Sequence, residues 1–238
     1  MYLLFTIYNM DYQKFLDDTG VALQDMSLLK QAFTHRSFIN ENRDSNLAHN
    51  ERLEFLGDAV LELVITDFLF TTYDNKTEGD MTSLRSALVN AVTLAEVAKE
   101  LNVNEYLLLS RGESRDMGRA RQYILANTME AIIGAIYVGA SYDEAKKFIM
   151  TYIAPRVDSI MADGSWIDAK SKFQEKAQDD VSITPLYKTV SEVGPDHDKV
   201  FEVAVYLGDE EIATGKGKSK QDAEQAAARE ALKKRGWL

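Results

Sequence analysis

The chain has 238 residues, no cysteine and a formal net charge of −11. That length allows one large domain or two ordinary ones, and the absence of cysteine excludes a disulfide framework. No run of 18 apolar residues occurs, so we expect no membrane span. The lack of cysteine is compatible with a reducing cytoplasm, where we expect the protein to act. The apolar residues 1–10 lack a basic region and a cleavage site, which predicts a local extension rather than a secretory signal. The acidic balance argues against a general nucleic-acid binder.

The first 162 residues are predicted to form a helical domain, because apolar residues recur there at helical spacing. Helices are expected at 11–18, 26–33, 50–72, 80–101, 119–139 and 142–162. The polar stretch from Asn75 to Asp80 predicts a turn between two of them.

The segment NERLEFLGDAVLELVI at residues 50–65 places carboxylates inside an apolar helix. Glu51, Glu54, Asp58 and Glu62 are three or four residues apart and therefore share one helix face. A solvated acidic face is the ordinary explanation for such a stripe, but here apolar residues cover most of the remaining circumference. Because like charges at this spacing repel, a bound cation would stabilise the arrangement.

A second segment, YILANTMEAIIGAIYV at residues 123–138, is apolar nearly all round and predicts the central helix of a bundle. Its Asn127 and Glu130 are three residues apart and face the same way. Two buried helices with oxygen donors on facing sides can build a site for a hard cation. The absence of His and Cys beside these donors favours Mg²⁺ or Mn²⁺ over zinc.

Beyond a linker predicted at residues 163–167, the periodicity changes and predicts a small α+β domain at 168–238. Its expected elements are a helix at 168–180, a strand at 200–207, a turn at 208–210, a returning strand at 211–215 and a helix at 220–235. Ser219 precedes the last helix as its expected N-cap.

Together these segments resemble the ribonuclease III family. NERLEFLGDAVLELVI is similar to the family's signature, and the supporting motifs follow in the family's order: THRS (34–37), EGDMTSLRSALVN (78–90) and ILANTMEAIIGAIYVGA (124–140). The C-terminal part resembles a double-stranded-RNA-binding domain. The resemblance implies an all-α endonuclease domain, a helical bundle in residues 1–162, followed by an α-β-β-β-α domain.

The resemblance also implies a metal-dependent site. Glu54, Asp58 and Glu130 would be the catalytic, metal-coordinating carboxylates. Glu51 and Glu78 match further acidic positions, which would serve a second metal or contact the substrate. Mg²⁺ is the expected cofactor, Mn²⁺ can substitute for it, and a metal-bound water would be the nucleophile.

Asn127 departs from the family pattern, which usually has Asp at this position and would make Asn127 a metal ligand. An amide oxygen can still coordinate a hard cation, but it supplies no negative charge. Two interpretations stay open: a natural variant that remains active, or a weakened or inactive double-stranded-RNA-binding protein that keeps the nuclease-like half as a scaffold. A third, a helical cation-binding protein without an RNA role, leaves the C-terminal domain unexplained.

The activity implied by the resemblance is hydrolysis of phosphodiester bonds in double-stranded RNA, leaving 5′-phosphates and short 3′ overhangs. The expected roles include processing of ribosomal and messenger RNA precursors. The family resemblance further implies a homodimer in which Phe55 inserts into the partner subunit, although a core role for Phe55 is an open alternative.

RNA recognition requires groups that reach the shallow minor groove and cations that reach the phosphates. By resemblance, the RNA-binding residues are Gln174 and Glu175 on the first helix, His197 in a loop between strands, and Lys216, Lys218 and Lys220 around the start of the last helix. The dipole at that helix N-terminus adds to phosphate attraction. Lys220 is followed by Gln221 where the family often has a second lysine, so one phosphate contact is expected to be absent.

Overall fold

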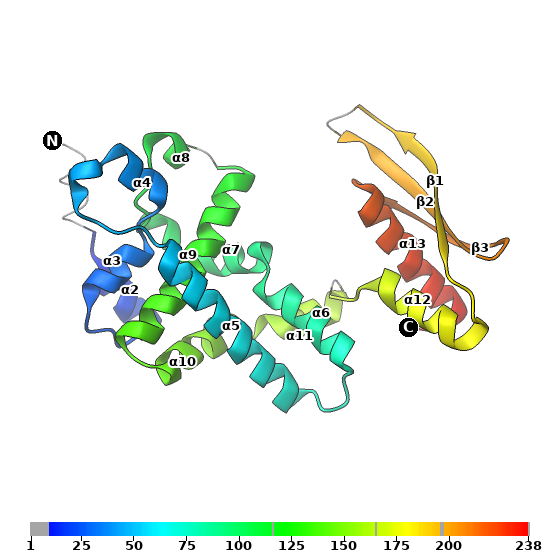
Figure 1. Cartoon of the computed structure of the whole chain (residues 1–238), viewed down its shortest axis with the longest axis horizontal. Helices are drawn as coiled ribbons and strands as arrows, with labels where there is room; N and C mark the ends of the chain where they lie inside the picture. The colour runs from blue at the N-terminus through cyan, green and yellow to red at the C-terminus, as the bar shows by residue number, and fades with distance from the viewer. Residues whose placement is uncertain (1–9, 116, 165, 196–197, 238) are drawn as a thin grey trace. The chain divides into compact units, whose positions relative to one another are not determined.

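The computed structural model describes residues 10–237 except 116, 165, 196 and 197. The chain divides into two compact units between Trp166 and Ile167 (Figure 1), and each unit is described by itself. The predicted extension at residues 1–10 lies outside the described residues except for its last position. The exact bounds of the predicted linker at 163–167 stay a prediction. In the described part of the chain, no helix combines the length and apolarity needed to cross a membrane.

The first unit is helical, which confirms the all-α prediction. Its helices are α2 (Tyr12–Thr19), α3 (Met26–Ala32), α4 (Arg36–Glu41), α5 (Glu51–Thr72), α6 (Glu78–Val89), α7 (Ala91–Glu100), α8 (Arg111–Arg115), α9 (Arg119–Gly139), α10 (Tyr142–Tyr152) and α11 (Arg156–Asp163). Two short 3₁₀ segments, η1 (Arg43–Ser45) and η2 (Val103–Glu105), join some of them.

Two long helices predicted from periodicity are each divided in the structure. Asn90 has an extended backbone, and its side chain accepts hydrogen bonds from the N–H groups of Val92 and Thr93, so it ends α6 and caps α7. The predicted helix 142–162 is interrupted at Ile153, and α11 begins after Pro155. The short helices α4 and α8 were not predicted.

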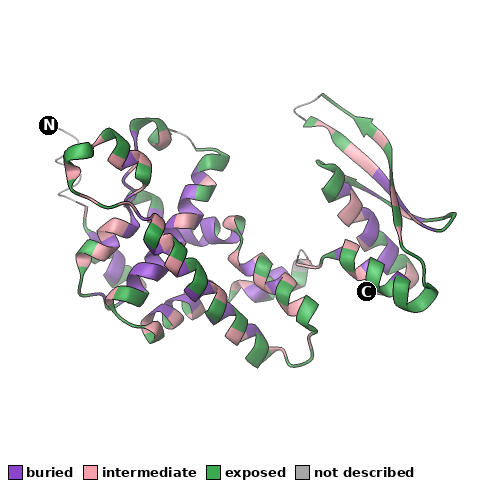
Figure 2. Ribbon diagram, viewed as in Figure 1, coloured by how far each residue is buried: buried purple, intermediate pink, exposed green. Residues whose placement is uncertain are grey.

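The centre of this unit is the contact between α5 and α9. Residues 131–136 of α9 are all buried, and Figure 2 shows buried segments in purple where the helices of this unit pack together. A Cβ atom on Gly57 would lie 1.7 Å from the carbonyl oxygen of Glu130, and one on Gly134 would lie 2.2 Å from that of Leu53. The two backbones therefore touch, which only glycine permits at these positions.

The second unit has the order α12 (Ala169–Val181), β1 (Leu186–Val193), β2 (Val200–Leu207), β3 (Glu210–Gly217) and α13 (Lys220–Arg235). The three strands form an antiparallel sheet in the order β1-β2-β3, and both helices pack on one face of it (Figure 1). The core between sheet and helices contains Phe173, Val205, Ile212 and Leu232. The predicted α-β-β-β-α fold is confirmed.

Gly57→Ala tests the contact between the helices. The added methyl group would collide with backbone atoms of α9 that cannot move independently, so we expect the unfolding free energy to fall by at least about 2 kcal/mol. Gly79→Ala is the matched control, because a Cβ there would meet its nearest atom only at 3.9 Å. Thermal unfolding monitored by circular dichroism measures both. Equal melting temperatures for the two variants would contradict the close contact.

Candidate active site

The four carboxylates on α5 do not share one environment. Glu51 lies 3.0 Å from Arg36 Nη1 and 3.7 Å from His49 Nδ1. Glu62 accepts a 2.8 Å contact from Arg85 Nε. Glu54 and Asp58, between them, have no ion pair with any described residue. Along α5, the first and last of the four carboxylates are therefore neutralised by arginines, whereas the charges of the two middle ones, Glu54 and Asp58, are not balanced by an ion pair.

Glu130 on α9 faces these two middle carboxylates. Burial, followed by the negative charges of Asp58, Glu54 and Glu62, raises the pKa of Glu130 to about 8. A carboxyl group shifted this far is partly desolvated and lies close to other carboxylates. The structure therefore brings the three predicted catalytic carboxylates together.

The pKa of Glu54 is also raised, although the amide of Asn127 opposes the shift. Burial and the charges of Glu51 and Asp58 raise the pKa of Glu54, while a hydrogen bond from the Asn127 side chain acts in the opposite direction. Asn127 therefore belongs to the same site as the carboxylates, as predicted from its spacing to Glu130. An amide can donate its N–H to one carboxylate and still present its oxygen elsewhere.

The glycine contact explains why these groups meet. Glu54 and Asp58 lie three residues before and one residue after Gly57, and the Glu130 carbonyl is the atom nearest to the position of a Cβ on Gly57. Because the backbones touch at this point, side chains at their margins are held in one partly buried space. We call Glu54, Asp58, Asn127 and Glu130 the carboxylate site.

The carboxylate site fits a hard divalent cation by its chemistry. Its donors are carboxylate and amide oxygens, which suit Mg²⁺ or Mn²⁺. Burial, and after it the charges of Asp58 and Glu54, raises the pKa of Glu130, and neither Asp58 nor Glu54 has an ion pair among the described residues. In the same described residues, no three His, Cys, Asp or Glu side chains are already arranged to hold a metal ion. A cation would therefore need the amide of Asn127 or a side-chain adjustment.

Glu78 lies elsewhere on the nuclease unit. It is exposed in the first turn of α6, accepts a hydrogen bond from Thr82 at 3.0 Å and lines a hollow of about 180 Å³ together with Leu69, Phe70 and Met81. Phe70 is twelve residues beyond Asp58 on α5, which corresponds to about 18 Å along a helix. Within one chain, the structure does not bring Glu78 to the carboxylate site.

Phe55 is 80% exposed, so the alternative of a core role is wrong. Ala59, Leu63 and Phe70 follow at successive spacings of four, four and seven residues and are exposed on the same side of α5. We call Phe55, Ala59, Leu63 and Phe70 the α5 stripe. An exposed apolar strip of this length on a helix marks an interaction surface.

The predicted RNA-binding residues lie on the surface of the second unit, apart from His197, which lies outside the described residues. Gln174 and Glu175 are exposed on α12. Lys216, Lys218 and Lys220 are exposed where β3 leads into α13, and Ser219 caps that helix by accepting the N–H of Asp222 at 3.1 Å.

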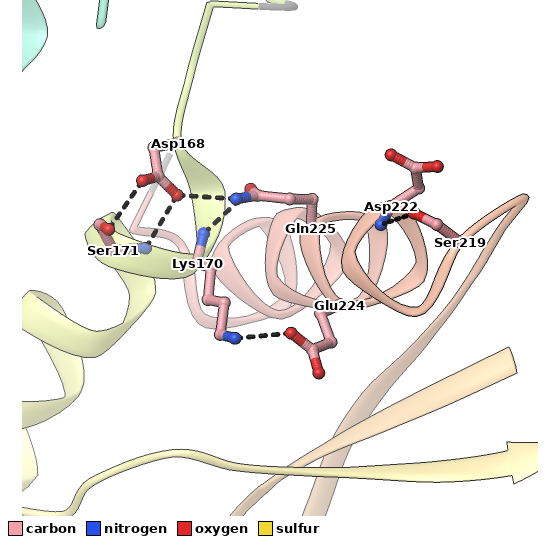
Figure 3. A network of polar contacts seen from close by, with 7 residues as sticks. All are labelled: Asp168, Lys170, Ser171, Ser219, Asp222, Glu224 and Gln225. Atoms are coloured by element: carbon pink, nitrogen blue, oxygen red, sulfur yellow. Dashed lines mark hydrogen bonds and ion pairs between the residues drawn. The ribbon is translucent and has the colours of Figure 1, made fainter. Parts of the chain in front are cut away.

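A polar network that the sequence analysis did not identify joins α12 to α13 (Figure 3). Asp168 caps α12 by accepting from Ser171 N and Oγ at 3.1 and 2.7 Å, and Gln225 of α13 donates to it at 2.8 Å. Lys170 Nζ lies 2.5 Å from Glu224. Burial raises the pKa of Asp168, but the hydrogen bonds from Gln225 and Ser171 outweigh it and lower the pKa overall. The spacing of Asp168 and Ser171 was the available sequence signal.

The pKa of Glu130 predicts how the metal-free protein responds to pH. A carboxyl whose pKa is higher in the folded than in the unfolded state binds protons more tightly when folded, so stability falls as pH rises between the two values. We expect the melting temperature in EDTA to fall between about pH 4.5 and pH 8. Glu130→Gln removes this titration and should reduce the decline. Parallel pH profiles for the two proteins would contradict the buried, crowded carboxyl.

Comparisons with known proteins agree with this architecture. A family model described as Ribonuclease-III-like matches residues 25–157, and one described as Double-stranded RNA binding motif matches residues 169–235. Ribonuclease 3 of Borreliella burgdorferi is 44% identical over 220 residues, covering 92% of this chain and 89% of the relative. Ribonuclease 3 of Protochlamydia amoebophila is 45% identical over 215 residues, covering 90% and 87%.

Among solved structures, the nuclease domain of ribonuclease III from Campylobacter jejuni is similar to the first unit. It matches with a TM-score of 0.55 and 38% identity, covering 61% of this chain and 97% of that domain. That structure is described as showing flexibility in a region involved in dimer formation. On the two matched domains and the similarity over nearly the whole length, the chain belongs to the ribonuclease III family of endoribonucleases and carries a double-stranded-RNA-binding domain.

Proposed function

We propose that this endoribonuclease hydrolyses phosphodiester bonds of double-stranded RNA at the carboxylate site, with Mg²⁺ as cofactor and Mn²⁺ as a substitute. The observation that carries the proposal is that Glu54, Asp58 and Glu130 share a partly buried space, where burial and then the charges of Asp58 and Glu54 raise the pKa of Glu130 to about 8 in the absence of a cation. Bound divalent cations supply charge neutralisation at phosphate and an activated water. The proposed products carry 5′-phosphates and short 3′ overhangs.

Each residue of the carboxylate site has a proposed role. Glu54, Asp58 and Glu130 would hold the cation through their oxygens. Asn127 would donate its N–H to Glu54, as its effect on the pKa of Glu54 indicates, and direct its amide oxygen to the cation. Proposed substrates include ribosomal and messenger RNA precursors, and the proposed compartment is the cytoplasm.

The competing interpretation, a double-stranded-RNA-binding protein without catalysis, is not favoured. The relatives that match nearly the whole chain are named Ribonuclease 3, and the three carboxylates meet in one site. Glu130→Gln separates the two interpretations. We expect it to lower cleavage of labelled duplex RNA by at least about 100-fold and to leave duplex binding unchanged. A wild-type protein that binds but never cleaves with Mg²⁺ or Mn²⁺ would support the non-catalytic interpretation.

Asn127→Asp tests how the amide limits metal binding. A fourth carboxylate would attract the cation more strongly, although it would also raise the pKa values of its neighbours, so we expect the Mg²⁺ concentration for half-maximal cleavage to fall roughly tenfold. Asn75→Asp, in the exposed turn after α5, adds the same charge far from the site and serves as the control. An identical Mg²⁺ dependence for wild type and Asn127→Asp would show that position 127 does not act on the cation.

We propose that two copies pair through the α5 stripe. An isologous contact places the same helix face on both subunits. Antiparallel pairing of α5 about Leu63 sets the partner's Phe55 opposite Phe70, beside the hollow of about 180 Å³. The same pairing directs Glu78, which lines that hollow, towards the partner's carboxylate site. This arrangement gives Glu78 its predicted role in substrate or second-metal contact across subunits.

Phe55→Glu tests the dimer, because a charge in an apolar contact is strongly unfavourable. We expect light scattering after size exclusion to show a dimer for wild type and a monomer for Phe55→Glu at micromolar concentration. Val92→Glu is the control, since Val92 is 54% exposed on α7, away from the α5 stripe. A wild-type monomer at every concentration would exclude the paired arrangement.

For RNA recognition we propose that Gln174 and Glu175 of α12 contact the minor groove while Lys216, Lys218 and Lys220 contact phosphates. His197 is proposed to reach the minor groove as well. The network between Asp168 and Gln225 supports this division of roles, because it fixes α12 against α13 and so sets the spacing between the two contact regions.

A further inference from the structure

The lysines proposed to contact phosphate are each paired with a carboxylate of their own domain. The three pairs are Lys216 Nζ–Glu202 Oε1 at 3.6 Å, Lys218 Nζ–Asp198 Oδ1 at 3.7 Å and Lys220 Nζ–Glu192 Oε1 at 3.0 Å. We call these six residues the junction pairs. Their formal charges cancel, so the predicted phosphate-binding surface carries no net charge from them in the free protein.

The sheet register places two of these carboxylates. Glu202 on β2 lies directly opposite Lys216 on β3. Glu192 on β1 lies opposite Phe201 on β2, and the Lys220 ammonium lies 5.7 Å from the centre of the Phe201 ring. Directly opposed residues are the closest cross-strand neighbours in a sheet. The strand pairing therefore holds Glu202 beside Lys216, and it holds Glu192 beside Phe201, whose ring the Lys220 ammonium approaches.

Such exposed pairs contribute little to folding stability, but each holds a negative charge close to the position that a phosphate bound to the lysine would occupy. Two anions that each lie about 3 Å from one ammonium are at most about 6 Å apart, so a phosphate at Lys220 is repelled by Glu192. If the phosphate displaces the carboxylate, the freed carboxylate takes up a cation from solution. That uptake offsets part of the cation release that normally drives binding.

We propose that Glu192, Asp198 and Glu202 compete with RNA phosphates for the three lysines and thereby set the selectivity of the domain. The proposal rests on the proposed RNA-binding surface and adds to it a role for the carboxylates. Every nucleic acid presents phosphates, whereas the 2′-hydroxyl groups in the shallow minor groove belong to RNA. By weakening only the phosphate contacts, the carboxylates make binding depend on the groove contacts of α12, and so favour A-form RNA over other polyanions.

The test compares three full-length proteins in EDTA, where no cleavage occurs. The first is wild type. The second, called the junction variant, carries Glu192→Gln, Asp198→Asn and Glu202→Gln. The third is a charge-matched control with Asp209→Asn, Glu210→Gln and Glu230→Gln, whose carboxylates contact none of the three lysines. Affinities for duplex RNA and for duplex DNA of the same sequence are measured by filter binding from 50 mM to 1 M salt.

We expect the junction variant to bind duplex RNA about tenfold more tightly than wild type and the control at 100 mM salt. Its plot of log affinity against log salt should be steeper by up to about one unit for each pair, so the gain disappears near 1 M. Affinity for duplex DNA should rise by a larger factor, which lowers the ratio of RNA to DNA binding. Each single substitution should show part of the gain, which covers the case that the triple variant does not fold.

Two other outcomes would be informative. Equal or weaker RNA binding by the junction variant, or an equal gain in the control, overturns the competition and leaves the lysines as contacts positioned by their carboxylates. Lys218→Ala with Lys220→Ala, measured alongside, tests the underlying surface. If that variant keeps wild-type affinity at low salt, the lysines do not contact RNA, and the proposed phosphate-binding surface fails together with the inference.

Discussion

The contact between the backbones of α5 and α9 at Gly57 and Gly134 determines how close the carboxylates of the nuclease domain lie to one another. Helices packed through ordinary side chains lie about 8–10 Å apart, which leaves room for solvent at the margins of the contact. Here a Cβ on either glycine would overlap a carbonyl oxygen of the other helix, so the helices come closer. The carboxylates beside the glycines are therefore held in a partly buried space, where desolvation and mutual repulsion both disfavour their charged forms. The pKa of Glu130 is raised because this carboxyl is buried beside the other carboxylates.

Acidic residues have opposite uses in the two domains. In the carboxylate site, Glu54 and Asp58 have no cationic partner among the described residues, and after burial their charges contribute to the raised pKa of Glu130. In the RNA-binding domain, acidic residues are paired with the lysines that face solvent. The net charge of −11 therefore describes neither surface, because unpaired negative charge lies in the carboxylate site while the three lysines of the RNA-binding domain are paired with carboxylates.

Local rules were sufficient to predict the helices that carry the site. The spacing of carboxylates in an apolar run located α5 and α9 to within about a residue, since helical periodicity is a property of the segment alone. The ion pairs of these carboxylates could not be predicted in the same way, because Arg36 and Arg85, which neutralise Glu51 and Glu62, come from other segments of the chain. The breaks at Asn90 and Pro155 were missed although both residues signal a helix boundary, because the apolar pattern continues across them.

The geometry of α5 links the carboxylate site to the proposed dimer contact. Neighbouring residues on a helix point about 100° apart, so Glu54 faces the carboxylate site while Phe55 faces outward. This explains why apolar residues cover most of the circumference of residues 50–65. One apolar face packs on α9, and a second apolar face, the α5 stripe, is exposed. A rotation of α5 that improved one face would displace the other. The carboxylate site and the proposed dimer contact are therefore constrained together by a single helix.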